Sequence, residues 1–344
     1  MKRFFSIIIV TWNGLHHLKN YLPSVVSTNY PNFEIIIADN ASTDGSSEWI
    51  KSNYPDCKIT SLDQNFGYAG GNNRAAKQAA GDILVFLNND AKPDPDWLTA
   101  LNETLNDTDA DILQPKIKSI DHPEYFEYAG AAGGYIDWLG YPFCKGRLFD
   151  KIEKDEGQYD NIDRIFWASG AAFTIEKKLF FDLDGFDERF RFHMEEIDLC
   201  WRALKNGKTI YNSPKSIVYH LGAGSLSDLS SQKTFYNYRN SLFMLTKNIE
   251  THLFFKLFLR LLLDGISGIR FLFKGYPNHT LAIVKSHFSF YSHLKELFVS
   301  RRKLRENHAL SLSVNLIHSN LILFEYFIFG KKTFNELKRS PRSK

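Results

Sequence analysis

Five residues, SIIIV at 6–10, form an apolar run that leads directly into the polar residues TWN at 11–13. Two similar runs follow, EIIIA at 34–38 and ILVFL at 83–87, and each also ends in polar residues. Apolar runs rich in Ile and Val that lack alternation are typical of strands buried on both faces, as in a parallel sheet covered by helices on each side. The three runs therefore predict strands of an open α/β sheet.

The segments between these runs have helical character. Residues 15–27 and 46–53 are expected to form crossover helices that return the chain for the next parallel strand. Ser42 or Thr43 precedes the second helix, and hydroxyl side chains commonly cap the first turn of a helix. This alternation of strand and helix predicts the α/β class for the first 90 residues.

Polar residues at the strand ends are the first candidates for a site, because ligands of open α/β sheets bind beyond the carboxyl ends of the strands. Asp39 at such an end suits a hydrogen bond to a base or ribose, although an Asp is also common in an ordinary strand-to-helix turn. Asp90 suits a divalent cation shared with substrate phosphates, or again a turn. The Gly-rich segment NFGYAGGNN at 65–73 enters a helix and lets backbone N–H groups approach an anion closely.

The overall composition is that of an ordinary globular protein. The 344 residues include 42 Lys and Arg against 39 Asp and Glu, and 44% are apolar, which excludes a disordered, fibrous or disulfide-stapled chain.

The three cysteines lack CxxC spacing, so neither a disulfide framework nor a structural zinc site is expected, and a reducing compartment fits best. The short apolar run near the N-terminus is expected to be a strand and not a secretion signal.

Periodicity and composition divide the chain into three regions. Residues 1–110 carry the strand and helix pattern, whereas residues 111–245 are less regular and rich in Gly and aromatic residues, which is typical of segments that line a binding site. Within the second region, residues 195–205 are expected to form a helix that Gly207 ends. Residues 246–344 have a helical pattern and are basic.

Six motifs, in their order and spacing, carry a resemblance to a known family. They are SIIIVTWN, ADNASTDGS, NFGYAGGNN, FLNND, WASGAAF and FHMEEIDLCWRA. Over roughly residues 4–245 the chain resembles the family 2 glycosyltransferases of GT-A fold, and within them the bacterial rhamnosyltransferase-like branch. The resemblance implies a Rossmann-like, mostly parallel sheet flanked by helices, with a nucleotide-sugar-binding half at 1–110 and an acceptor half at 111–245. It also implies inverting transfer of a sugar from a nucleotide diphosphate donor, assisted by Mg²⁺ or Mn²⁺.

The resemblance assigns the donor site to residues near the strand ends. Thr11, Asn13 and Asp39 match nucleoside-binding positions, with Asp39 expected to meet the base. The other residues that match donor-binding positions are Asn65, Gly67, Gly71, Asn73, Ser169, Gly170, Glu195 and, as a diphosphate contact, Arg239. Trp138, Tyr141 and Trp167 suit stacking on a sugar face, or they are ordinary core aromatics.

The metal and the catalytic base are assigned in the same way. Asn88, Asn89 and Asp90 match an Asp-x-Asp metal motif whose first Asp is replaced by Asn88, which shifts metal binding onto Asp90. His220 resembles the family's metal-binding histidine and would offset the missing carboxylate.

Glu196 matches the position of the general base that takes the proton from the acceptor hydroxyl. Its neighbours Glu195 and Asp198 equally suit the positive end of the helix dipole, and Arg202 is placed to pair with Asp198 across one helical turn.

The C-terminal region differs from the rest in charge. Residues 251–344 hold 16 Lys and Arg and five Asp and Glu, a net of +11, against −8 for residues 1–250. On a helical wheel, residues 253–274 leave only a narrow polar stripe beside a broad Leu, Phe and Ile face. Such a helix suits lying on an anionic membrane, or its apolar face packs on the catalytic domain or in a homodimer. Residues 310–329 form a second apolar segment, and no run is long enough to span a bilayer.

These patterns together predict a cytoplasmic or peripheral inner-membrane transferase that acts on a surface glycan or a polyprenyl-linked acceptor, with no nucleic acid as partner. Two rival functions remain open. Nucleotidyl transfer uses a similar sheet but needs a basic phosphate loop near the N-terminus, which Trp12 to Leu15 do not supply. A non-catalytic binding module of the same fold is favoured by Asn88 and opposed by Asp90, Glu196 and His220.

Overall fold

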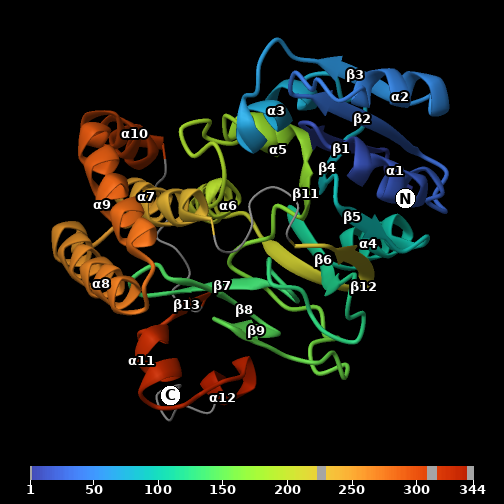
Figure 1. Ribbon diagram of the computed structural model, residues 1–344. Helices are drawn as coiled ribbons and strands as arrows, with labels where there is room; N and C mark the ends of the chain where they lie inside the picture. Colours follow the sequence, from blue (N-terminus) through green and yellow to red (C-terminus); the bar gives the residue numbers. More distant parts are fainter. Residues whose placement is uncertain (1, 223–229, 308–315, 339–344) are drawn as a thin grey trace.

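The computed structural model describes residues 2–222, 230–307 and 316–338. A large sheet with helices on both faces fills one side of the molecule, and the C-terminal helices gather on the side away from the N-terminus (Figure 1). A smaller sheet lies below the large one in this view. The predicted α/β class is therefore confirmed.

The large sheet has eight strands in the order β3-β2-β1-β4-β11-β6-β12-β5. Strands β1, β2, β3, β4, β6 and β12 are mutually parallel, whereas β11 and β5 are antiparallel to their neighbours. The mostly parallel sheet expected from the sequence is thus present. Its strands are β1 (Phe5–Thr11), β2 (Phe33–Asp39), β3 (Lys58–Ser61), β4 (Ile83–Asn88), β5 (Ala91–Pro93), β6 (Ile112–Ser119), β11 (Ala172–Glu176) and β12 (Ile210–His220).

Alternate residues of the first strand face two separate cores, as expected for a strand buried on both faces. Ile7 and Ile9 pack with apolar residues of α1, α2 and α4, whereas Ile8 packs in the cluster that contains residues of α3, α5, α6 and α7. The seven helices are α1 (Leu15–Val26), α2 (Ser46–Asn53), α3 (Gly67–Ala76), α4 (Trp97–Asp107), α5 (Lys177–Asp182), α6 (Glu195–Lys205) and α7 (Ser231–Asn248).

The predicted start of α2 is wrong in its capping residue, whereas the predicted end of α6 is confirmed. Neither Ser42 nor Thr43 caps α2, because the residue before it is Gly45 in a left-handed conformation, with φ of 82°. The side chain of Asp44 instead accepts a hydrogen bond from the backbone N–H of Ser46 at 3.1 Å. Helix α6 ends as expected, since Gly207 at φ of 71° donates its N–H to a carbonyl of the last turn.

The smaller sheet has the order β10-β9-β8-β7-β13 and is not indicated by any pattern in the sequence. Its last strand comes from the C-terminal region and runs parallel to β7, so residues 111–245 and the C-terminal region share a sheet. The strands have only two to four residues each, which is too short for periodicity to be recognised. They are β7 (Gly134–Asp137), β8 (Pro142–Cys144), β9 (Arg147–Leu148), β10 (Lys151–Ile152) and β13 (Ile317–His318).

The C-terminal region is helical as expected. The helix predicted at 253–274 is α8, and part of the second apolar segment forms α11, while residues 310–315 of that segment lie outside the described residues. Of the helices that the structure describes, none combines the length and the apolar character needed to cross a membrane. The helices are α8 (Leu253–Phe273), α9 (Pro277–Ser292), α10 (Leu294–Asn307), α11 (Ile322–Phe327) and α12 (Phe334–Lys338).

Candidate active site

The predicted strand-end residues lie at one edge of the large sheet. Thr11 and Asp39 are paired in register at the ends of β1 and β2, and Val10 is paired with Asn88 at the end of β4. His220 ends β12, which is parallel to these strands through β6. The topology therefore places four of the predicted site residues, far apart in the sequence, along the same edge.

Asp90 and His220 are brought together by the pairing of two strands. Just after Asp90 the chain forms β5, which is antiparallel to β12 with Ala91 opposite His220. As a result, Oδ1 of Asp90 lies 3.1 Å from Nε2 of His220, and both side chains are buried. The side-chain amide of Asn88 lies 3.0 Å from the same ring nitrogen.

Glu127, which the sequence did not single out, completes this cluster. Its Oε2 lies 3.3 Å from Nδ1 of His220, and the side chain is buried. Burial opposes the charge on the imidazole, but the carboxylates of Asp90 and Glu127 outweigh it and raise the pKa of His220 to about 10. Burial likewise opposes ionisation of Asp90, yet His220 lowers the pKa of that carboxyl below its ordinary value.

The loop after β2 is organised by the predicted nucleoside-binding residues. Oδ1 of Asp39 accepts a hydrogen bond from the N–H of Ser42 at 2.8 Å, and its other oxygen accepts one from the hydroxyl of Ser47. Oδ1 of Asn13 accepts from the N–H of Thr43 at 2.8 Å. These contacts hold the loop against the end of β1.

Thr11 and the glycine-rich segment form the neighbouring part of the edge. The hydroxyl of Thr11 accepts a hydrogen bond from the amide of Asn89 at 3.2 Å. Asn65 accepts one from the N–H of Gly67, whose φ of 72° and closeness to the backbone of Arg191 exclude a side chain there.

Two other residues of this segment make packing contacts. A Cβ at Gly71 would lie 2.9 Å from the side chain of Val10, so this glycine lets α3 approach β1 closely. Asn73 both donates to the carbonyl of Phe186 and accepts from its N–H, at 2.8 and 2.9 Å. The structure thus gives Gly71 and Asn73 contacts that fix α3, and their donor-binding role stays a prediction.

Glu195 and Glu196 begin helix α6 in an environment that disfavours charge. Burial raises the pKa of Glu196 to about 7, although backbone N–H groups of the first helical turn partly offset it. Burial, followed by the charge of Glu196, raises the pKa of Glu195 well above its ordinary value. One oxygen of each carboxyl, Oε2, is buried without a hydrogen-bond partner. A carboxyl whose pKa lies near neutrality, as at Glu196, is suited to act as a general base or acid.

The loop before α6 is held in an uncommon conformation. Arg191, His193 and Met194 have φ of 63°, 66° and 74°, and non-glycine residues in this region carry a cost that surrounding contacts must offset. The amide of Asn240 on α7 supplies such contacts, since it donates to three carbonyls of the loop between Phe190 and His193. Strain of this kind is typical of functional sites.

Asp198 and Arg239 have structural partners. Asp198 is fully buried and accepts from Arg202 at 2.9 Å and from Lys247 at 2.8 Å, which confirms its expected pairing with Arg202. The guanidinium of Arg239 donates to the carbonyls of Arg189 and Phe190. Arg239 therefore supports the loop before α6, and a contact with diphosphate stays a prediction.

Hydrogen bonds run from the Asp90 cluster toward the two glutamates. Asn88, beside His220, donates its backbone N–H to the carbonyl of Ala171 at 3.1 Å. The preceding Gly170 accepts from the hydroxyl of Tyr68 at 2.7 Å. The charges of Glu195 and Glu196 are close enough to add to burial in raising the pKa of that hydroxyl.

Ser169 and the three aromatic candidates are placed as follows. Ser169 is buried and donates its backbone N–H to the side-chain oxygen of Gln114 at 2.9 Å. Trp167 is a buried core residue that donates to the carbonyl of Tyr135 at 2.9 Å. The guanidinium of Arg260 covers the ring of Tyr141 at 3.7 Å, and Lys256 lies 5.7 Å from the ring of Trp138.

Residues 6–180 match the protein-family model described as glycosyl transferase family 2. The chain belongs to this family. As a member it is a glycosyltransferase, and its structural neighbours share the GT-A fold.

Similar proteins include a rhamnosyltransferase and an O-antigen biosynthesis protein. It is 26% identical over 240 residues to an N-acetylglucosaminyl-diphospho-decaprenol L-rhamnosyltransferase of Mycobacterium tuberculosis, covering 65% of this chain and 78% of that protein. It is 28% identical over 230 residues to an O-antigen biosynthesis protein of Myxococcus xanthus, covering 65% of this chain but only 18% of that protein. The rhamnosyltransferase-like resemblance is thus confirmed.

The fold is similar to that of a mannosyltransferase from Pyrobaculum calidifontis whose structure contains GDP-mannose and Mn²⁺. The TM-score is 0.54 at 14% identity, over 85% of this chain and 88% of the other. At this identity the likeness supports the fold alone.

Proposed function

We propose that this glycosyltransferase moves a hexose or deoxyhexose, with inversion, from a nucleotide diphosphate sugar onto a hydroxyl of a glycan or polyprenyl-linked acceptor. The observation that carries the proposal is Glu196, a carboxyl with a pKa of about 7 and one unpartnered buried oxygen, at the start of α6. A base whose pKa is close to the working pH is the most effective proton acceptor. The contacts through Tyr68 and Gly170 relate Glu196 to the sheet edge where a donor binds in this fold class.

In the proposed reaction, Glu196 takes the proton of the acceptor hydroxyl as its oxygen attacks the anomeric carbon. The new C–O bond forms on the face opposite the diphosphate, and the bond from the anomeric carbon to the diphosphate oxygen breaks. The nucleoside diphosphate leaves with the electron pair of the broken bond, which inverts the configuration at that carbon. In this proposal the nucleoside end of the donor is held by Thr11, Asn13 and Asp39, which lie at or next to the ends of β1 and β2.

Asp90 and His220 are the residues that would hold Mg²⁺ or Mn²⁺. Oδ1 of Asp90 lies 3.1 Å from Nε2 of His220, so both atoms could contact one cation. Such a cation would supply positive charge to the leaving diphosphate.

The protein supplies few ligands to this proposed metal site. Within the described part of the chain, no three His, Cys, Asp or Glu side chains form a group able to hold a metal ion. Substrate phosphates and water would therefore complete the coordination, as is usual for Mg²⁺. Oε2 of Glu127, 3.3 Å from Nδ1 of His220, would help to orient the ring so that Nε2 is on the side of Asp90.

The donor and acceptor are inferred from similar proteins. The relative of M. tuberculosis is named for transfer of L-rhamnose to a diphospho-decaprenol-linked sugar, and one structural neighbour, of S. aureus, contains UDP-GlcNAc. We therefore propose a dTDP-rhamnose-like or UDP-hexose donor, and a surface-glycan or lipid-linked acceptor at the cytoplasmic side of the membrane.

Ligand-dependent melting tests the proposal. Nucleoside diphosphates and nucleotide sugars are added singly, with and without Mn²⁺, and a ligand that binds only the folded protein raises its melting temperature. We expect at least one nucleotide to raise it, and Mn²⁺ to increase the shift in the parent but not in Asp90→Ala. Turnover is then measured with the donor that binds. No shift with any nucleotide would contradict the proposed donor site.

A further inference from the structure

Helix α8 is oriented with its polar side toward the protein and its apolar side outward. Arg260 and Asp264 are almost completely buried. The guanidinium of Arg260 donates to the hydroxyl of Ser241 at 2.5 Å, and Asp264 faces Nε2 of His287 at 3.3 Å. The middle of the narrow polar stripe is thus used in packing, so the Phe-rich face does not pack on the catalytic domain.

The apolar face of α8 is therefore exposed on the surface of the molecule. The exposed fractions of Phe254 and Phe273, near its two ends, are 76% and 87%. Of the 25 large apolar side chains that are exposed in the described residues, 19 lie after residue 250. An apolar area of this extent on a protein surface marks an interaction site. The exposed members on α8 are Phe254, Phe255, Phe258, Leu262, Ile266, Ile269, Leu272 and Phe273.

Neighbouring helices extend this face. Phe288 on α9 is 70% exposed, and the residues around the end of α11 include the exposed Phe327. Arg270 of α8 lies 5.4 Å from the ring of Phe327, which places α11 beside the C-terminal half of α8. We call the exposed apolar side chains of α8, α9, α10 and α11 the outer face.

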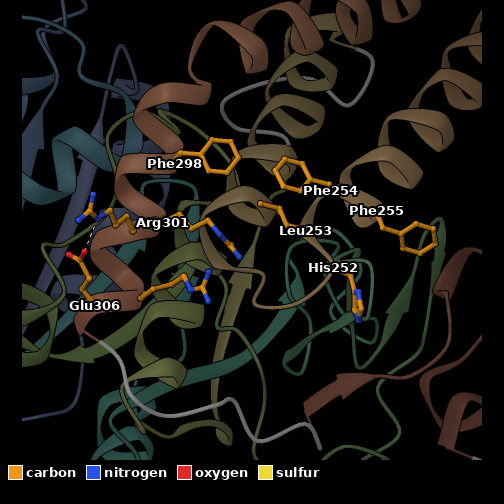
Figure 2. Close-up of a pocket in the computed structure, with 9 residues that line it drawn as sticks. His252, Leu253, Phe254, Phe255, Phe298, Arg301 and Glu306 are labelled. Atoms are coloured by element: carbon orange, nitrogen blue, oxygen red, sulfur yellow. Dashed lines mark hydrogen bonds and ion pairs between the residues drawn. The ribbon is translucent and has the colours of Figure 1, made fainter.

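Cations border the outer face at the start of α8. A groove of about 670 Å³ lies between that helix end and α10, and Figure 2 shows Phe254 and Phe298 facing each other across it. Their rings stack at 6.3 Å between centres. The basic residues that line the groove are Arg301, Arg302 and Arg305.

We infer that the outer face docks on the surface of an anionic phospholipid bilayer. Exposed Phe and Ile side chains enter the boundary between headgroups and acyl chains, and the exposed Arg302 and Arg305 of α10 meet lipid phosphates. The net charge of +11 on residues 251–344 complements an anionic surface. A symmetric dimer through the same face would instead bring two such basic regions together, because a two-fold interface uses the same patch on both chains.

Vesicle flotation of the full chain tests this inference. Vesicles of mixed phosphatidylglycerol and phosphatidylcholine are compared with phosphatidylcholine alone, at low and high salt. We expect flotation with the anionic vesicles, at least about tenfold weaker binding when Phe254→Ser and Phe258→Ser are combined, and weaker binding at high salt. Arg302→Gln with Arg305→Gln is expected to reduce the preference for phosphatidylglycerol.

Matched variants control for altered surfaces in general. Ile162→Ser removes an exposed apolar side chain, and Lys51→Gln with Lys77→Gln removes exposed cations, all far from the outer face in sequence. These variants are expected to float as the parent does. Circular dichroism and melting establish that each variant is folded.

Two outcomes would overturn the inference. One is equal recovery of the parent in the soluble fraction with every vesicle. The other is a concentration-dependent dimer in sedimentation equilibrium that Phe258→Ser dissociates, without any vesicle binding. Membrane docking does not rest on the proposed chemistry, so Glu196→Gln is expected to float as the parent does. The flotation test therefore distinguishes failure of the docking inference from failure of the transferase proposal.

Discussion

The edge of the large sheet that carries the candidate site and the outer face of the C-terminal helices place polar and apolar groups in opposite ways. At the edge, charged side chains such as Asp90 and His220 are buried and paired, above cores filled with Ile, Leu and Phe. On α8 the charged Arg260 and Asp264 are also buried, but the Phe and Ile side chains face outward. The first arrangement is expected where water has to be excluded from a reaction, and the second where the surroundings are themselves apolar.

The largest effect expected on the catalytic half comes from its buried ion pairs. Asp198→Ala leaves Arg202 and Lys247 buried without this carboxylate, and breaking such a pair costs about 3–5 kcal/mol in free energy of unfolding. Urea unfolding measures the change. The matched variant Asp182→Ala, in an exposed pair with Lys178, is expected to leave the free energy of unfolding unchanged within error. If both variants lost the same free energy of unfolding, burial of the ion pair would not determine its contribution to stability.

Glu196→Gln is expected to have the next largest effect. Turnover falls at least about a hundredfold, because the amide cannot take the acceptor proton, while donor binding by titration is unchanged. The exposed Glu48→Gln is the control. In the parent, burial raises the pKa of Glu196 to about 7, so the carboxylate form and kcat both increase as the pH rises through 7. Unchanged turnover, or no change of kcat in this pH range, would exclude Glu196 as the base.

Glu127→Gln tests whether the third member of the buried cluster acts through His220. Loss of the carboxylate beside Nδ1 is expected to weaken Mn²⁺ binding about tenfold, the usual scale for a residue that orients a metal-binding histidine. Electron paramagnetic resonance of free Mn²⁺, in the presence of a nucleoside diphosphate, measures the affinity. Glu124→Gln, three residues away and exposed, is the control. Equal affinities would make Glu127 a structural residue only.

Local patterns in the sequence predicted much of the catalytic half. The buried strands β1, β2 and β4 were recognised to within one residue at each end, since Ile-rich runs without alternation have few other interpretations. The bounds of α6 were predicted in full. Motif spacing also indicated Asp90 and His220, which the structure then places 3.1 Å apart.

Other features depend on contacts between distant parts of the chain. Glu127 lies in an irregular segment that contacts β6, the neighbour of β12, since the N–H of Glu127 donates to the carbonyl of Ile117. Its proximity to His220 follows from this contact, which no local pattern records. The strands of the small sheet are too short to be recognised, and Gly45 rather than a hydroxyl residue precedes α2. The wheel of α8 identified its polar stripe, but only the packing of Arg260 against α7 determines that this stripe faces inward.

The smallest effect on stability is expected for a substitution on the outer face. It gives the most direct comparison between an exposed and a buried aromatic side chain. Phe258→Ser changes the free energy of unfolding in water by less than about 0.5 kcal/mol, as is usual for exposed positions, because this side chain is 64% exposed and has little packing to lose. The same substitution at the fully buried Phe243 of α7 is expected to cost about 3–5 kcal/mol, the scale of removing a large aromatic side chain from a core. Urea unfolding without lipid or detergent measures both. If Phe258→Ser were as costly as Phe243→Ser, the outer face would already be covered in solution, and the opposition between the two halves of the molecule would not hold.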